Sequence, residues 1–175
     1  MKTAIFAAFA AASIVTPALA QSDLDEATAF TGPRIGVTTG YDKVQDHDGV
    51  TYGVAAGYDL PVGTKLRAGV EVGLADSTAK TDTVKASRDL SASARLGYIV
   101  TPKIMPYAKV GYTSSRFEDR TGSGAGAGFE GVRYGAGVEV APTPRTYISA
   151  EYQRTEYEAN IGGRDAAMVG VGLRF

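Results

Sequence analysis

The chain ends in residues 165–175, DAAMVGVGLRF, where two kinds of side chain alternate without interruption. The positions of one parity are all apolar: Ala167, Val169, Val171, Leu173 and Phe175. From Met168 on, the positions between them carry methionine, glycine or arginine. Because successive side chains of a strand point to opposite faces, this stretch predicts a β-strand with one apolar face and one small or charged face. The strand also ends on an aromatic residue, Phe175, and the pattern of the preceding strands indicates why.

The same alternation runs from residue 32 to the end of the chain and predicts eight strands. We expect them at residues 33–41, 50–60, 65–75, 88–100, 105–117, 130–140, 146–157 and 165–175. Short proline-containing turns are expected at 60–64, 101–104 and 141–145, because proline fixes φ and cannot donate a ladder hydrogen bond. Longer polar, glycine-containing loops are expected at 42–49, 76–87, 118–129 and 158–164. Short turns at one end and long loops at the other are typical of an outer-membrane barrel.

One face of the expected strands carries no charge, whereas the other carries charges of both signs with many glycines between them. The charged positions are Arg34, Asp59, Lys65, Arg67, Glu71, Arg95, Lys109, Arg133, Glu139, Glu151 and Arg174. A narrow barrel interior accommodates long charged side chains only where neighbouring positions are small. The glycines on this face therefore favour an interior, lumen-facing position for the charges.

Aromatic residues on the uncharged face lie near the strand ends. Towards the long loops these are Tyr41, Tyr52, Tyr112, Tyr134 and Tyr152, and towards the short turns Tyr58, Tyr98 and Phe175. Such aromatic girdles flank the apolar band of membrane barrels. A soluble barrel of the lipocalin type is the alternative, and it would need its apolar face inside. We predict an all-β, eight-stranded antiparallel up-and-down transmembrane β-barrel over residues 32–175, with both termini on the short-turn side and Phe175 at the membrane interface.

The first twenty residues have the pattern of a secretory signal peptide. Lys2 gives a positive start, residues 4–15 are apolar, and the segment closes on an A-x-A-like site at Ala20. We expect cleavage after Ala20, because the apolar run is too short for a comfortable membrane anchor, the alternative. Residues 21–31 are polar and acidic without a period and are expected to form a short, loosely ordered periplasmic tail.

Three stretches carry a resemblance to a known family. They are YGAGVEVAPTPRTYISAEYQRTEY at 134–157, AAMVGVGLRF at 166–175 and GYDLPVGTKLRAGVEVG at 57–73. In this order they resemble the small outer-membrane β-barrels that include the OmpA/OmpX-type transmembrane domain and the opacity-type, porin-like proteins. The resemblance implies the outer membrane of a Gram-negative bacterium, with lipid and lipopolysaccharide as surroundings, and a C-terminal aromatic residue that the barrel-assembly machinery reads. No peptidoglycan-binding domain follows Phe175, so that function of OmpA proteins is not implied.

The sequence predicts no catalytic, metal or cofactor site. Its single histidine, His47, is expected in a solvated loop at an Asp48-Gly49 turn, although barrel enzymes that modify lipid A resemble this chain in size. Asp42, Asp46 and Asp48 lack the alternate spacing and distant glutamate of a calcium loop, and a divalent-ion contact with lipopolysaccharide phosphates stays a weaker alternative. Residues 126–131 match G-x-G-x-x-G outside any βαβ unit and are read as part of a mobile hairpin loop. The chain has no cysteine, and its net charge of −1 argues against a nucleic-acid partner.

The inward charges have two interpretations, a network of ion pairs that fills the lumen or the lining of a narrow channel. An eight-stranded barrel is just wide enough for its own side chains, which favours the filled lumen. The expected pairs are Lys109 with Glu139, and Asp59 with Lys65 or Arg67, and breaking one would cost about 3–5 kcal/mol. We predict a monomeric, non-enzymatic protein with a structural or surface-exposed role and four outer loops available for contacts. The alternatives are a porin-like channel, an adhesin or receptor and, least favoured, a lipid A-modifying enzyme.

Overall fold

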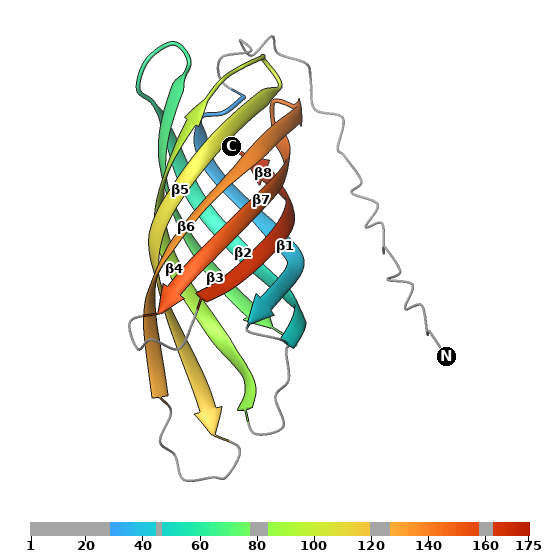
Figure 1. Cartoon of the computed structure of the whole chain (residues 1–175). Helices are drawn as coiled ribbons and strands as arrows, with labels where there is room; N and C mark the ends of the chain where they lie inside the picture. The colour runs from blue at the N-terminus through green and yellow to red at the C-terminus, as the bar shows by residue number, and fades with distance from the viewer. Residues whose placement is uncertain (1–28, 45–46, 78–83, 120–126, 158–162) are drawn as a thin grey trace, which may run out of the picture.

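Eight strands close into one antiparallel barrel in the computed structural model, which describes residues 29–44, 47–77, 84–119, 127–157 and 163–175. The strands are β1 (Gly32–Val44), β2 (His47–Pro61), β3 (Leu66–Ser77), β4 (Val84–Tyr98), β5 (Ile104–Asp119), β6 (Ala127–Thr143), β7 (Thr146–Tyr157) and β8 (Gly163–Arg174). Each strand pairs with its neighbours in the sequence, and β1 pairs with β8 to complete the ring (Figure 1). The predicted fold class is confirmed.

The start of β1 and the end of β8 both lie at the end of the barrel that has the short connections, as expected (Figure 1). The strands are joined there by residues 62–65, 99–103 and 144–145. The amide of Phe175 donates to the carbonyl oxygen of Pro33 at 2.9 Å, so the last residue of the chain lies beside the start of β1. We call this the short-turn end and the opposite one the loop end.

The strands run further towards the loop end than the sequence pattern indicated. Pairing between β1 and β2 continues to Lys43 opposite Asp48 and Val44 opposite His47, so the predicted Asp48-Gly49 turn is wrong. Residues 127–130 likewise belong to β6 rather than to a loop. Backbone hydrogen bonding does not require an apolar side chain, so the ladder continues past the point where alternating hydrophobicity ends. Asp46 and residues 1–28, with the predicted signal peptide, lie outside the described residues.

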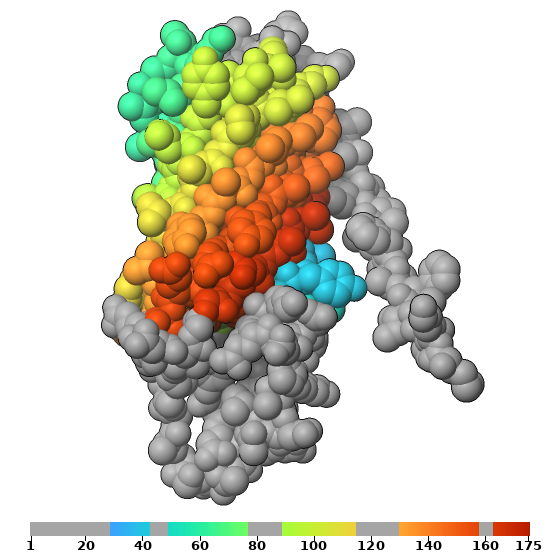
Figure 2. Space-filling model, in the orientation of Figure 1, coloured from blue at the N-terminus to red at the C-terminus, as the bar shows by residue number. Residues whose placement is uncertain are grey.

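The outer wall is apolar and the interior is charged. Mid-strand aliphatic residues such as Val37, Val70 and Val110 are more than half exposed, whereas Asp59, Arg95 and Glu139 are buried. Figure 2 shows the wall from the side of β5 to β8 as a continuous surface. An apolar band of this extent is not stable in water, and the lipocalin-like alternative with its apolar face inside is therefore wrong. The described residues contain no helix long and apolar enough to cross a membrane.

Buried apolar side chains form a cluster at the short-turn end rather than a central core. It consists of Ala29, Phe30, Met105 and Ala141, with the partly buried Ile99 packed against it. Phe30 is fully buried, so the expectation of a loosely ordered tail is wrong for its last residues. Gly32 follows with φ of +93°, a conformation that side-chain-bearing residues rarely adopt, and a Cβ there would collide with the carbonyl oxygen of Phe175.

Candidate functional site: the charged lumen

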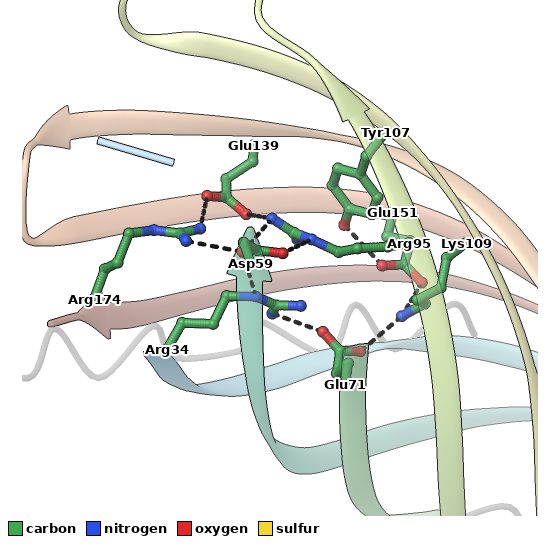
Figure 3. Close-up of polar contacts among 9 residues, drawn as sticks. All are labelled: Arg34, Asp59, Glu71, Arg95, Tyr107, Lys109, Glu139, Glu151 and Arg174. Atoms are coloured by element: carbon green, nitrogen blue, oxygen red, sulfur yellow. Dashed lines mark hydrogen bonds and ion pairs between the residues drawn. The ribbon is translucent and has the colours of Figure 1, made fainter. Parts of the chain in front are cut away.

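A network of eight charged side chains spans the lumen near the short-turn end, and each strand contributes one of them (Figure 3). In strand order they are Arg34, Asp59, Glu71, Arg95, Lys109, Glu139, Glu151 and Arg174. Four are cations and four are anions, so the network carries no net formal charge. All eight point inward because they share the parity that the alternating pattern assigns to the lumen. We call this set the lumen network.

Asp59 is the most highly connected member of the lumen network. Its Oδ2 accepts from Nε of Arg34 at 3.0 Å and from Nη1 of Arg174 at 2.8 Å, and its Oδ1 accepts from Nε of Arg95 at 2.8 Å. Glu139 bridges the last two arginines, with Oε2 at 2.9 Å from Nη2 of Arg95 and Oε1 at 2.6 Å from Nη2 of Arg174. These five side chains are at most 3 % exposed. Every carboxylate oxygen of Asp59 and Glu139 therefore has a cationic donor.

The other half of the network is centred on Lys109. Its Nζ lies 3.0 Å from Oε1 of Glu71 and 2.6 Å from Oε1 of Glu151. Glu71 connects the two halves, because its Oε2 also lies 2.7 Å from Nη1 of Arg34. The hydroxyl of Tyr107 donates to Oε2 of Glu151 at 2.7 Å, which extends the chain of contacts across the lumen (Figure 3). The eight charges thus form one connected set.

The ion pairs predicted from the sequence are not those of the structure. Lys109 lies opposite Gly135 on β6, four residues from Glu139, so the predicted Lys109–Glu139 pair is wrong. Lys65 is exposed on the outside, with its Nζ 6.0 Å from the centre of the Tyr98 ring, and it does not pair with Asp59. Arg67 does point inward, where it donates to the carbonyl oxygens of Gly63 at 3.1 Å and Leu66 at 2.9 Å.

A second cluster of charges, which the sequence interpretation missed, lies in the lumen towards the loop end. Asp89 binds Arg133, Arg164 and the hydroxyl of Thr113, and Arg164 also binds Asp42. Of these residues, Arg133 alone was predicted to be a lumen charge. Asp42 and Arg164 share the parity of Arg34 and Arg174 but lie just outside the predicted strands, and Asp89 lies within one. Parity counted along the full length of the strands would have found all three.

The pairing of Asp42 with Arg164 also bears on the calcium alternative, since that carboxylate is buried and bound to a cation. Within the described strands and turns there is no group of three or more histidine, aspartate or glutamate side chains that could hold a metal ion. Asp48, another residue of the calcium alternative, belongs to strand β2.

A cavity of about 80 Å³ separates the two clusters. Small residues of the inner wall line its middle, among them Gly73, Ser91, Ser93, Ser149 and Gly170. Because one water molecule needs about 10–15 Å³ of such volume, the space is large enough for a handful of waters between the two clusters.

All eight aromatic residues predicted to form the girdles lie on the outer wall. Tyr41, Tyr52, Tyr58, Tyr98, Tyr112, Tyr134, Tyr152 and Phe175 are each 42–74 % exposed. Three at the loop end donate their hydroxyl to a carboxylate on the next strand: Tyr112 to Glu130, Tyr134 to Glu156 and Tyr152 to Asp165, at 3.3, 2.8 and 2.6 Å. The outer face therefore changes from apolar to charged at this level, which marks the edge of the apolar band at the loop end.

The revised pairing makes a prediction for double-mutant cycles. We expect Lys109→Ala and Glu71→Ala to show a coupling energy of about 0.5–3 kcal/mol, because the two side chains are in direct contact. Lys109→Ala and Glu139→Ala should couple more weakly, since they are connected only through other members of the network. The measurement is the free energy of unfolding of the four proteins of each cycle in urea. A stronger coupling for the second pair would restore the pairing predicted from the sequence.

Comparison with known proteins identifies relatives of this fold. The family described as outer membrane protein beta-barrel domain matches residues 4–175. The structure is similar to Neisserial surface protein A (18 % identity over 82 % of this chain and 96 % of that one, TM-score 0.62) and to Ail, the attachment invasion locus protein of Yersinia pestis (16 %, 83 % and 97 %, 0.62). It is also similar to the outer membrane enzyme PagL (16 %, 81 % and 99 %, 0.57). No protein with a curated description matches the sequence.

Proposed function

Because the chain belongs to the outer-membrane β-barrel domain family, we propose that it is an integral outer-membrane protein with a structural or surface-exposed role and a closed lumen. The observation that carries the proposal is the lumen network, in which every strand contributes one charge and the formal charges cancel. Such a network ties all eight strands together across the interior.

The closed lumen is supported by the cost of separating these pairs. A hydrated ion could pass only if side chains that are at most 3 % exposed moved apart, including the contacts of Asp59 with three arginines. Removing one partner from a buried pair costs several kcal/mol, because the remaining charge stays buried without compensation. The narrow porin-like channel is therefore the less favoured alternative.

We propose the four connections at the loop end as the parts that make specific contacts outside the cell. The fold itself does not select a role, since an attachment and invasion protein and an enzyme have similar structures. A Ser-His-acid mechanism would depend on His47, the single histidine, which begins β2. The charges of the lumen network are engaged with one another, which favours a non-enzymatic role.

The same proposal includes the surroundings and biogenesis of the protein. The apolar band between the two aromatic girdles fits outer-membrane lipid, and the charged level at the loop end fits the polar region of lipopolysaccharide. We propose cleavage of a signal peptide after Ala20, insertion by the barrel-assembly machinery, which reads Phe175, and a monomeric barrel.

The proposal predicts that the refolded protein, residues 21–175, does not conduct in a planar lipid bilayer. Folding is established first by a heat-sensitive shift on a gel, so that silence cannot come from unfolded protein. The expected result is the absence of discrete current steps at voltages where a known porin, added to the same bilayer afterwards, conducts. Steady, discrete openings of the folded protein would overturn the closed lumen and support the channel.

A further inference from the structure

The segment that precedes β1 carries two buried residues at the short-turn end of the lumen. Phe30 is fully buried and Ala29 is 6 % exposed, although both lie outside the barrel strands. Phe30 packs with Met105 of β5 and Ala141 of β6, which are the buried residues nearest the short-turn end on those strands, and with Ile99. The aromatic ring therefore occupies the mouth of the barrel.

Phe30 lies next to charges that are among the most deeply buried of the described residues. Met105 is the direct cross-strand partner of Glu139, and Ala141 is two residues further along β6. The side chains of Glu139 and Asp59 are 0 % exposed and that of Arg174 is 2 % exposed. At the loop end the arginines of the second cluster, Arg133 and Arg164, are 13 % and 14 % exposed. The arginines are thus more deeply buried on the side where Phe30 lies, whereas the loop-end carboxylates Asp42 and Asp89, 1 % and 4 % exposed, are nearly as buried as Asp59 and Glu139.

The backbone is built for this inward turn. Gly32 adopts φ of +93° between Phe30 and the first pairs of β1, in the region that glycine alone enters without strain. The absence of a Cβ at Gly32 also leaves room for the carbonyl of Phe175. The chain can therefore reverse from the mouth into the wall within two residues.

We propose that Ala29 and Phe30 form a tethered stopper that seals the short-turn mouth of the lumen, so that the lumen network is shielded from water on this side by an apolar side chain of the N-terminal segment. The proposal goes beyond the closed lumen, since it assigns the closure of one mouth to a segment outside the strands. The segment lies outside the strands, so it can leave the mouth without breaking strand pairing, whereas the strands cannot. The stopper is thus the movable part of the closure.

Thiol reactivity tests the stopper directly, because the chain has no cysteine and one introduced cysteine is a unique reporter. Ala141→Cys places a thiol in the mouth behind Phe30, and Met105→Cys is a second reporter should the first fail to fold. The folded barrel in detergent is treated with a charged methanethiosulfonate reagent, with and without Phe30→Ala. We expect the reaction at residue 141 to be at least tenfold faster in the Phe30→Ala protein. Phe30→Leu, which keeps an apolar side chain in the mouth, should change it much less.

Two controls make the result specific to the mouth. Thr64→Cys in an exposed turn should react rapidly in both backgrounds and gives the unhindered rate. Ser91→Cys lines the cavity beyond the lumen network and should react equally with and without Phe30. Equal rates at residue 141 in both backgrounds would overturn the stopper, whether both are fast or both slow. An equal acceleration at residue 91 would also overturn it, because the whole barrel would then have loosened. Conductance is not read in this experiment, so its outcome is separate from that of the closed lumen.

Discussion

Asp59→Asn is expected to lower the free energy of unfolding by about 3–5 kcal/mol, measured by urea unfolding of the barrel in lipid vesicles. The substitution preserves the shape of the side chain and removes its charge. Arg34, Arg95 and Arg174 would then keep their positions in the lumen with one of their shared counterions gone. The loss should be large because these arginines are at most 3 % exposed, and the carboxylates that remain beside them, Glu71 and Glu139, are each already shared between two cations.

The matched control is Asp165→Asn, the same chemical change on the outer face. Asp165 is 40 % exposed and lies 3.6 Å from Arg154, so its ion pair is screened by solvent. We expect a change of about 0–1 kcal/mol. If the two variants unfold at the same urea concentration, the lumen network does not stabilise the barrel, and the proposed structural role of the charges is wrong.

The number of strands and the direction of their faces could be predicted from the sequence because both depend on local pattern. In β8, for example, the alternation of apolar residues with glycine and arginine fixes which side chains meet lipid. The aromatic residues near the two ends of the strands then indicate that the apolar face points outwards. Burial of Arg34, Arg95 and Arg174 follows from parity alone, without knowledge of any partner.

The partners within the lumen could not be predicted, because they depend on register and on the stagger of strands around the closed barrel. Lys109 and Glu139 are on adjacent strands, which suggested a pair, yet their side chains enter the lumen at different levels. Arg174 of β8 reaches Asp59 of β2, and Arg95 of β4 reaches Glu139 of β6. Contacts across the interior between strands that are not neighbours leave no signal in a linear pattern.

The residues that lie in the lumen at its two ends were also not predicted, for a different reason. Alternating hydrophobicity ends where the apolar band ends, so the pattern places Asp42 and Arg164 in loops although both belong to strands. Phe30 was a single aromatic residue in a polar segment, and nothing local indicates that it folds back into the lumen. Only the left-handed backbone at Gly32, which a lone glycine in a sequence does not reveal, explains that turn.

Val171→Arg is expected to destabilise the folded barrel in a lipid bilayer by about 2–4 kcal/mol, the cost of an arginine near the bilayer midplane. Val171 is on the outer face of β8, four residues from Phe175 at one girdle and four from Ala167. Ala167 lies opposite Tyr41 and Tyr152 of the other girdle. The cross-strand partners of Val171 are Val37 and Ile148, which are apolar and about half exposed. Neither can pair with the new charge.

Val62→Arg is the control, since this valine is 59 % exposed but lies in the short turn after β2, outside the apolar band. The same substitution should cost there about 0–1 kcal/mol. The measurement is urea unfolding in vesicles for both variants. In short-chain detergent the difference between them should shrink, because a small micelle deforms around a charge more readily than a bilayer does. Equal stability of the two variants in vesicles would mean that the band around Val171 does not face lipid hydrocarbon, and the orientation of the barrel in the membrane would have to be reassigned.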